Sequence, residues 1–351
     1  MTPQHVLVLT GAADSRDRAA LLTPVLNHAS VVVQVHRMPT GGDVDCRSDL
    51  PHPDRTPDCI VLFHGGLNTA ARIKALRARF NCPIVLRVGG RNDLAALDLA
   101  RGAIGSLRMG KALRHVANAA LDRRALRVAD GCICVTEALS MWVHGCTDKP
   151  VITCPPVRQL PGDAPPHEVN PAPWAVLTIS NLQYRAKVAG ALRLLPLFEQ
   201  LAAEVPKAAW RIVGSGAGVN RLHQRTRRSV AHDRITLAGW SDDVQGELLA
   251  AGQFWYASTL DAYPLSVSEA MWQGVPVLVE QRTPAAAMVP ACAAPAKADW
   301  VRHAVALTTS DALRSNAVAQ ASAYVRDRES PERLGGLLCE WIQQVRVGFN
   351  A

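Results

Sequence analysis

Hydrophobic residues occur in the first half of the chain as short uninterrupted runs, each of strand length. Segments with the pattern of helices separate these runs, which lie at 6–11, 31–36, 58–66, 83–90, 131–136 and 149–154. A strand that is apolar along its whole length is buried on both faces, as in parallel sheets that are covered by helices on each side. The first half therefore predicts an α/β domain around a parallel sheet.

A proline-rich segment interrupts this alternation at 155–173. It contains seven prolines and little periodicity, which is typical of a linker. A second alternating series begins at Trp174, and the end of the chain has an amphipathic helical pattern after a serine and a proline. We predict an N-terminal domain, a linker, a C-terminal domain and a final helix at 1–157, 158–173, 174–325 and 326–351.

The most informative run is 255–279, WYASTLDAYPLSVSEAMWQGVPVLV. It combines an apolar strand, a loop with Asp261, a helix with Pro264 in its first turn, and Glu269 further along that helix. Proline suits the first turn because that position makes no use of an N–H group, and the remaining amides at a helix start can bind an anion. A carboxylate beside such an anion site fits a nucleotide sugar. A helix between two buried strands also fits ordinary α/β packing.

Three further motifs precede this run in the same half of the chain. An apolar strand that starts at Trp174 leads through a polar turn to a helix with Lys187 near its beginning, where the lysine charge adds to the helix dipole and favours phosphate. A strand at 210–218 ends in glycines, including Gly214, that permit close approach of a ligand. Another short strand lies within 234–243.

These motifs, in this order, resemble the donor-binding domain of the retaining GT-B glycosyltransferases of family 4. The resemblance implies two Rossmann-like α/β domains whose parallel sheets face each other across a central cleft, with the final helix crossing back onto the N-terminal domain. It also implies a retaining glycosyltransferase. The donor would be a nucleoside-diphosphate sugar of UDP or GDP type, and the acceptor a glycan, a lipid-linked sugar or a small molecule.

The resemblance assigns a role to each donor-side residue. Lys187, helped by Arg185, would bind the diphosphate, and Glu269 would hold ribose hydroxyls. Asp261 would act on the transferred sugar as a catalytic residue, at a position where the family usually has glutamate. The other donor-binding positions are Asn181, which replaces a common arginine, Gly214, and the backbone of Pro264, Leu265 and Ser266. No D-x-D metal site follows a strand, so neither a metal nor another cofactor is expected.

Candidate acceptor-side residues follow the strands of the first half. His64 precedes a glycine doublet and is a candidate general base, because its ordinary pKa lies near neutrality; alternatively it caps the strand end. Retaining members of the family are thought to use the leaving phosphate to help deprotonate the acceptor, so a histidine base is not required. The remaining acceptor-side candidates are Gly11, Arg87, Gly89, Gly90 and Asp93.

Basic residues are concentrated at 101–127, which contains seven Lys or Arg and a single acid, Asp122. Apolar residues recur there at helical spacing, so the segment predicts a basic amphipathic helix that lies on an anionic membrane or simply presents a solvated face. The first residues have the pattern of a buried strand rather than a signal peptide. We therefore expect a cytoplasmic protein, which associates peripherally with the inner face of the membrane if this helix lies on it.

Composition and missing motifs exclude several other functions. The net charge of +8 would attract polyanions, but only 5% of residues are aromatic and none alternate with basic residues, which argues against nucleic-acid binding. A dinucleotide-binding G-x-G-x-x-G is missing after the first strand, and in the glycine run at 214–218 Val219 takes the third glycine position. The nine cysteines form no C-x-x-C pair, so Cys132 and Cys134 are interpreted as reduced thiols rather than metal ligands.

A non-catalytic GT-B homologue that acts as a binding or scaffold protein remains the alternative to a glycosyltransferase.

Overall fold

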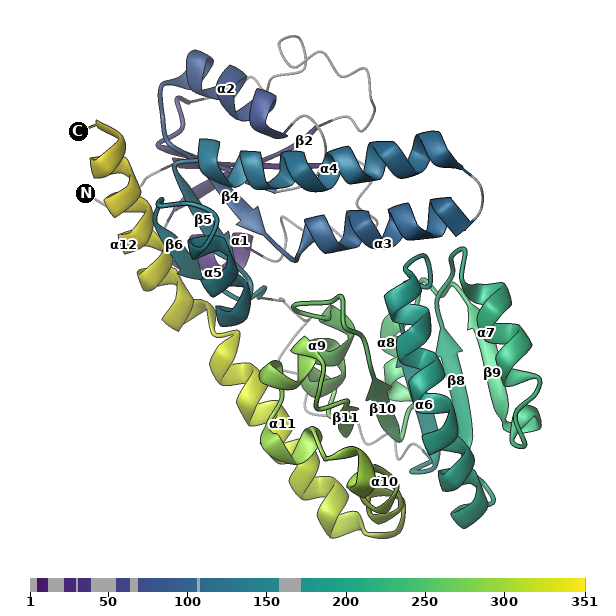
Figure 1. Cartoon of the computed structure of the whole chain (residues 1–351). Coiled ribbons are helices and arrows are strands. Elements are labelled where there is room, and N and C mark those ends of the chain that lie inside the picture. Colours follow the sequence, from purple (N-terminus) through teal and green to yellow (C-terminus); the bar gives the residue numbers. More distant parts are fainter. Residues whose placement is uncertain are drawn as a thin grey trace. The chain divides into compact units, whose positions relative to one another are not determined.

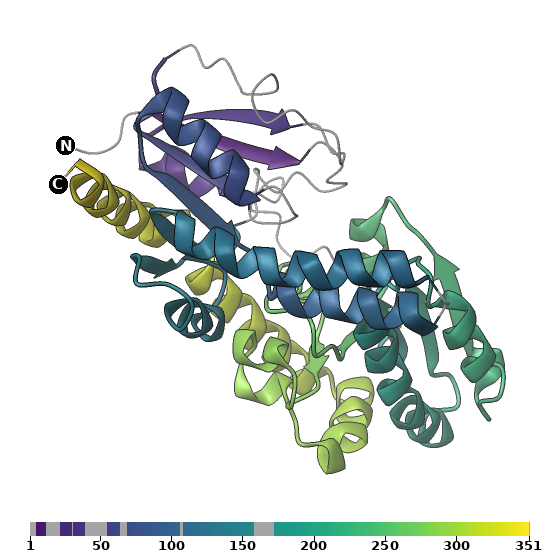
Figure 2. The same ribbon diagram turned by 45° about the horizontal axis from the view of Figure 1, so that its top comes forward.

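The computed structural model describes residues 5–11, 22–29, 31–38, 55–63, 69–105, 108–157 and 172–350. The chain divides into two compact units, which are Met1–Gly162 together with Glu329–Ala351, and Asp163–Arg328 (Figures 1 and 2). Each unit is an α/β structure around its own parallel sheet. His64 and most of the proline-rich segment lie outside the described residues.

A six-stranded parallel sheet with the order β2-β1-β3-β4-β5-β6 forms the centre of the first unit. Each apolar run of the first half provides one strand, and β3, β4 and β5 are almost completely buried. The order reverses between β1 and β3, which places the switch point of this sheet at their carboxyl ends. The strands are β1 (His5–Gly11), β2 (Val32–Met38), β3 (Cys59–Phe63), β4 (Ile84–Val88), β5 (Gly131–Cys134) and β6 (Val151–Thr153).

The last helix of the chain packs against the first one and completes the core of this unit. Trp341 and Leu338 of this helix are buried in the same hydrophobic cluster as Val6 and Val85. The indole ring of Trp341 occupies the space where a side chain at Gly131 would project, 2.8 Å from an ideal Cβ, so only glycine fits there. The helices are α1 (Thr23–His28), α2 (Thr69–Phe80), α3 (Asn92–Gly105), α4 (Met109–Val128), α5 (Glu137–His144) and α12 (Pro331–Asn350).

The prediction of one basic helix across 101–127 is wrong. The segment contains the end of α3 and most of α4, which lie side by side as an antiparallel hairpin (Figures 1 and 2). Glycine is a poor helix former, and Gly105 ends α3. α4 runs back alongside α3, and the Arg108 amide donates to the Ala103 carbonyl at 2.8 Å. The apolar spacing did not reveal this break.

The second unit contains a five-stranded parallel sheet with the order β11-β10-β7-β8-β9. Here the order reverses at β7, which pairs with β10 on one side and β8 on the other. The strands are β7 (Ala175–Ile179), β8 (Ala209–Val213), β9 (Ile235–Gly239), β10 (Gln253–Tyr256) and β11 (Val277–Val279). The helices are α6 (Arg185–Glu204), α7 (Val219–Thr226), α8 (Val244–Leu249), α9 (Leu265–Trp272), α10 (Trp300–Thr309) and α11 (Asp311–Arg328).

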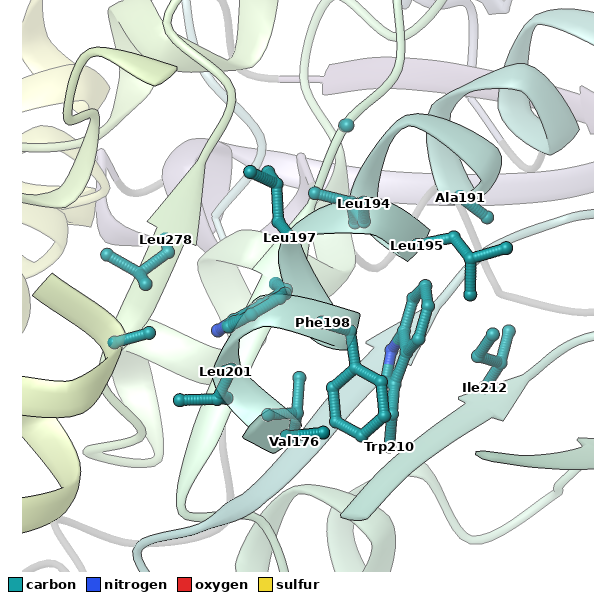
Figure 3. Packing of buried hydrophobic residues seen from close by; sticks show 14 of the residues in the cluster. Val176, Ala191, Leu194, Leu195, Leu197, Phe198, Leu201, Trp210, Ile212 and Leu278 are labelled. Atoms are coloured by element: carbon teal, nitrogen blue, oxygen red, sulfur yellow. The ribbon is translucent and has the colours of Figure 1, made fainter. Parts of the chain in front are cut away.

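Large aromatic side chains fill the core of the second unit. Phe198 of α6 packs on Trp210 of β8 with ring centroids 5.4 Å apart (Figure 3), and Trp255 meets Trp300 edge to face at 5.5 Å. The Trp210 indole donates to the Thr178 hydroxyl at 3.0 Å, and that hydroxyl donates to the Trp255 carbonyl at 2.9 Å. These bonds satisfy buried polar groups and fix the strands on both sides of β7.

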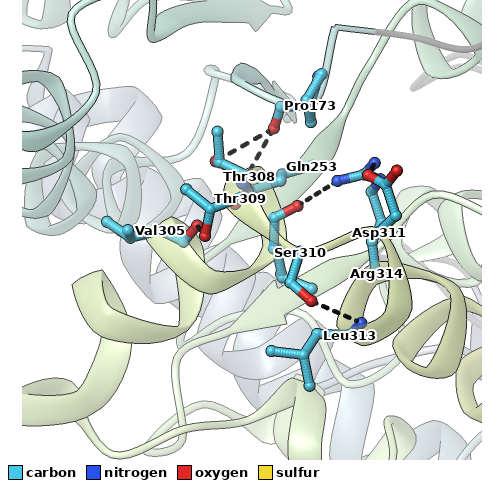
Figure 4. A network of polar contacts seen from close by, with 10 residues as sticks. Pro173, Gln253, Val305, Thr308, Thr309, Ser310, Asp311, Leu313 and Arg314 are labelled. Carbon is cyan, nitrogen blue, oxygen red and sulfur yellow. Dashed lines mark hydrogen bonds and ion pairs between the residues drawn. The ribbon is translucent and has the colours of Figure 1, made fainter.

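A buried glutamine ties the start of the second unit to its sheet (Figure 4). The Gln253 side chain is fully buried, and its amide donates to the carbonyls of Pro173 and Ala304 at 3.2 and 2.9 Å and to the Thr308 hydroxyl at 3.0 Å. One side chain therefore joins the residues that precede β7, the strand β10 and the helix α10. The path of the chain into β7 is thereby fixed.

Candidate active site

The reversal of strand order in the second unit locates a candidate site. In open parallel sheets, ligands bind at the carboxyl ends of the two strands where the order reverses, because the loops that follow them diverge there. These strands are β7 and β10. The loop after β7 leads into α6, which carries Lys187, and the loop after β10 carries Asp261 and leads into α9.

An ion pair joins the start of α6 to the loop after β10. Lys187 Nζ lies 2.8 Å from Asp261 Oδ1, and the two side chains retain 13% and 20% of their exposure. The pair is thus partly shielded from water yet reachable by a ligand. Lys187 is in the first turn of α6 and also lies over the Tyr184 ring, 5.8 Å from its centroid. The site therefore places a lysine at a helix start next to a carboxylate.

The second oxygen of Asp261 accepts a hydrogen bond from the hydroxyl group of Tyr256. Tyr256 is the last residue of β10, and its ring is buried and stacked on Phe254 with centroids 6.4 Å apart. Burial, and then the negative charge of Asp261 and its hydrogen bond, raise the pKa of Tyr256 well above its ordinary value. The tyrosine therefore remains a hydrogen-bond donor.

Close packing of α6 against the β10 loop holds these groups together. Gly190 lies one turn after Lys187, and a Cβ atom there would be 1.5 Å from the Ala257 carbonyl oxygen. Any other residue would push the helix away from the loop. On the opposite side, the Ser266 hydroxyl of α9 donates to the Ile179 carbonyl at the end of β7, at 3.3 Å.

The start of α9 lies directly behind the Asp261 loop. Pro264 has extended backbone angles and precedes the first helical residue, Leu265, so the helix begins one position later than the proline itself. Ser266 is buried, and Glu269 is only 2% exposed. A carboxylate this buried contacts a ligand only if the ligand itself enters the buried space beside it. The contact of Glu269 with ribose therefore stays a prediction.

The glycines after β8 have a packing function in the described structure. Gly214 and Gly216 have φ angles of +142° and +143°, which L-residues rarely adopt. A Cβ at Gly214 would be 1.8 Å from the Ser180 carbonyl oxygen, and one at Gly216 would be 2.2 Å from the Gln183 amide. These glycines therefore let the loop after β8 pack closely on the loop after β7, and the contact of Gly214 with a donor stays a prediction.

The two remaining donor-side candidates are at the surface. Asn181 is exposed, and its side-chain oxygen accepts a hydrogen bond from the Gln183 amide at 3.0 Å, which stabilises the turn before α6. Arg185 is exposed at the first position of α6, two residues before Lys187. A contact of either with phosphate is a prediction.

The acceptor-side candidates lie in the first unit, where Arg87 is buried and the glycines after it have open space beside them. Arg87 is a buried residue of β4, not a surface ion pair, and it donates to the Cys154 carbonyl at 2.5 Å, linking the ends of β4 and β6. Gly89 and Gly90 have open space where a side chain would project. Gly11 ends β1.

Asp93 is a structural ion-pair residue at the start of α3. It lies 2.8 Å from Arg91 Nε and 3.4 Å from Arg123 Nη2. Burial acts to raise the pKa of Asp93, but the hydrogen bonds and charge of Arg91 outweigh it and hold the pKa below its ordinary value. The contact with Arg123 joins α3 to α4, and the role of Asp93 in acceptor binding stays a prediction.

The two cysteines singled out in the sequence are buried in the sheet of the first unit. Cys132 and Cys134 are buried free thiols on β5; burial raises the pKa of both, that of Cys134 to about 12. Thiols of this kind are unreactive at neutral pH. In the described ranges, no group of three or more His, Cys, Asp or Glu side chains is arranged to hold a metal ion.

The sequence of the second unit matches a known family. Residues 163–290 match the model of glycosyl transferases group 1, a segment that includes Lys187, Asp261 and Glu269. No curated protein sequence is significantly similar to the chain.

Several solved structures have the same architecture. Sucrose-phosphate synthase from Thermosynechococcus elongatus is 15% identical, with a TM-score of 0.69 over 98% of this chain and 100% of that one. The chain has a GT-B fold. Anabaena Alr3699/HepE, crystallised with UDP and glucose, is 14% identical with a TM-score of 0.62 over 97% of this chain and 100% of that one.

A longer protein is also similar. TarM from S. aureus, in a complex that contains UDP, is 14% identical with a TM-score of 0.65 over 81% of this chain. The match spans 55% of the TarM chain, about half its length.

Two residues of the site were not predicted from the sequence. Tyr256 stands five positions before Asp261, and its place at the end of an apolar strand was the only available signal. Gly190 lies in the interior of α6, where glycine destabilises a helix. A glycine at such a position indicates close packing with another segment, and this was the available signal.

Proposed function

We propose that the protein is a retaining glycosyltransferase that uses a nucleoside-diphosphate sugar. The observation that carries this proposal is the Lys187–Asp261 ion pair at the switch point of β7 and β10, inside the segment that matches glycosyl transferases group 1. UDP in the structures of Alr3699/HepE and TarM supports a UDP-type donor, with GDP as the related candidate. A glycan, a lipid-linked sugar or a small molecule would be the acceptor.

In the proposed reaction the acceptor oxygen attacks the anomeric carbon on the face from which the diphosphate leaves. The bond from that carbon to the phosphate oxygen breaks, and the acceptor proton passes to the leaving phosphate. Lys187 and the first amides of α9 would stabilise the developing charge on the diphosphate. Asp261 would orient the sugar, and Glu269 would bind the ribose.

The stereochemistry of the product tests this mechanism. Purified protein with UDP- or GDP-sugars and candidate acceptors is expected to release the nucleoside diphosphate and to form a linkage with the donor's anomeric configuration, as measured by proton NMR. An inverted linkage would reject the retaining mechanism. Tight binding of the nucleotide without turnover of any sugar would instead favour a binding protein with this fold.

We further propose that the α3–α4 hairpin contacts an anionic membrane surface. Met109, Leu113 and Val116 form a stripe on α4 at helical spacing, with exposed fractions of 63%, 73% and 47%. Arg101, Arg108, Lys111 and Arg114 lie on the same hairpin, and no acidic residue occurs between positions 99 and 121. Each cation near such a surface contributes about 1 kcal/mol, and the exposed apolar side chains would enter the headgroup layer.

This proposal matches the other features of the chain that bear on location. No helix in the described part of the chain is long and apolar enough to cross a bilayer. We propose a cytoplasmic protein that is held at the inner face of the membrane by this hairpin.

Vesicle binding checks the membrane contact. Leu113→Asp is expected to abolish co-sedimentation with vesicles that contain phosphatidylglycerol, because it places a negative charge in the apolar stripe. The matched control is Leu337→Asp on α12, whose side chain is 51% exposed. Binding of the unchanged protein is expected to fall with salt, since exposed charges are screened within about 10 Å at 0.1 M. Equal binding to neutral vesicles would contradict an electrostatic contact.

A further inference from the structure

We propose that Tyr256 is a positioning residue that holds Asp261 in place while the donor is bound. The inference rests on the proposed function, in which Asp261 acts on the transferred sugar. Its basis is the pair of contacts on the carboxylate: Oδ1 meets Lys187 Nζ at 2.8 Å, and Oδ2 accepts the Tyr256 hydroxyl. Each carboxylate oxygen therefore has one of these partners.

The two partners of Asp261 differ in what a nucleoside diphosphate does to them. Lysine is a flexible point charge on a four-carbon stem, and a diphosphate with two or more negative charges competes with a single carboxylate for it. The Lys187 contact is therefore weakened when the donor binds. A tyrosine hydroxyl has no such competing attraction, so the contact with Tyr256 remains.

The ring of Tyr256 is fixed by the core of the second unit. It is 2% exposed, it is stacked on Phe254 with an angle of 12° between the ring planes, and its backbone pairs with Val279 of the neighbouring strand β11. Burial and the charge of Asp261 raise the pKa of Tyr256 well above its ordinary value, so the phenol keeps its proton at neutral pH and donates the hydrogen bond. A rigid donor at the end of a strand holds a carboxylate more accurately than a loop could alone.

The short side chain of Asp261 makes this support necessary. The aspartate side chain has only two rotatable bonds, so the position of its carboxylate follows that of the loop which carries it. The loop is fixed by the contact of Gly190 with Ala257, and the carboxylate plane is fixed by Tyr256. Tyr256 thus acts through Asp261 and does not itself need to touch the donor.

The test is Tyr256→Phe, which retains the stacked ring and removes only the hydroxyl. We expect kcat for sugar transfer to fall about tenfold or more, within the range for a lost hydrogen bond to a charged group. The dissociation constant of UDP, measured by calorimetry, is expected to change less than about twofold, because the diphosphate contacts are unchanged. The matched control is Tyr324→Phe, which removes a hydroxyl that donates to the Ala287 carbonyl at 3.4 Å and accepts from Arg328 Nη1 at 3.1 Å; this variant is expected to keep the original kcat.

A double variant distinguishes positioning from general damage. Tyr256→Phe is expected to have little further effect on kcat when Asp261 is already asparagine, because the two residues act as one unit. Additive losses, an unchanged kcat in Tyr256→Phe, or a loss of UDP binding together with kcat would each overturn the inference. If the unaltered protein turns over no nucleotide sugar, the proposed function fails and this inference fails with it; turnover that Tyr256→Phe leaves unchanged overturns the inference alone.

Discussion

Replacing Asp261 with asparagine is expected to lower kcat for sugar transfer by about 100-fold, comparable to the removal of one essential electrostatic contact in a transition state. The amide is neutral, and one of its two oxygens becomes a donor, so it loses either the Lys187 pair or the Tyr256 hydrogen bond. The affinity for UDP is expected to stay the same or to tighten. Lys187 would no longer be neutralised by a carboxylate 2.8 Å away and would attract phosphate more strongly.

Steady-state kinetics and calorimetry on the same preparation check this split between kcat and binding. Asp233→Asn is the matched control, because Asp233 is 70% exposed and its ion pair with Arg234 is 3.9 Å long. That variant is expected to behave like the unaltered protein. Weakened UDP binding with an unchanged kcat in Asp261→Asn would place Asp261 at the nucleotide and not at the sugar.

Replacing Lys187 with alanine is expected to weaken UDP binding by about 1.5–3 kcal/mol, the range for a hydrogen bond to a charged group. The variant loses the cation at the start of α6 and also leaves the negative charge of Asp261 unneutralised next to the diphosphate. Both changes have the same sign, so the upper half of the range is expected. Titration calorimetry at two salt concentrations measures the effect, and the difference between variants should shrink as salt screens the charges.

Lys207 provides the control for this experiment. It is an exposed lysine of the same unit, stacked over Trp174 at 5.2 Å, and Lys207→Ala is expected to leave UDP binding unchanged. Should a folded Lys187→Ala protein bind UDP as before, Lys187 does not contact the diphosphate. The diphosphate would then bind in another part of the second unit.

Most strands could be predicted from the sequence because parallel strands are buried on both faces and therefore appear as unbroken apolar runs. The run at 131–136 became β5, and the segment beginning at Trp174 became β7. The α3–α4 hairpin could not be predicted in the same way. A helix of 20 residues and the end of its neighbour have the same apolar spacing as one longer helix, and only the packing of α3 on α4 shows the turn.

The candidate site was predicted only in part. Lys187 and Asp261 were singled out because a lysine at a helix start and a carboxylate in a loop are each recognisable locally. Their direct contact was not predicted, since it depends on which strands are neighbours in the sheet. The function of Gly214 in packing against Ser180, and the burial of Arg87, also depend on distant backbone and were missed.

The sequence by itself determined the two α/β halves, the position of their strands, and the presence of a helix that begins near a lysine and of a later loop that carries an aspartate. These features follow from short-range patterns, because burial on two faces and the needs of helix ends are expressed within a few residues. Only the tertiary structure decided that β7 and β10 are neighbours and that Gly190 lets α6 approach Ala257. It also decided that Lys187 and Tyr256 meet on the two oxygens of one carboxylate. Such contacts join segments up to 77 positions apart, as Val176 and Gln253 are (253 − 176), and no local pattern specifies which distant backbone a side chain will meet.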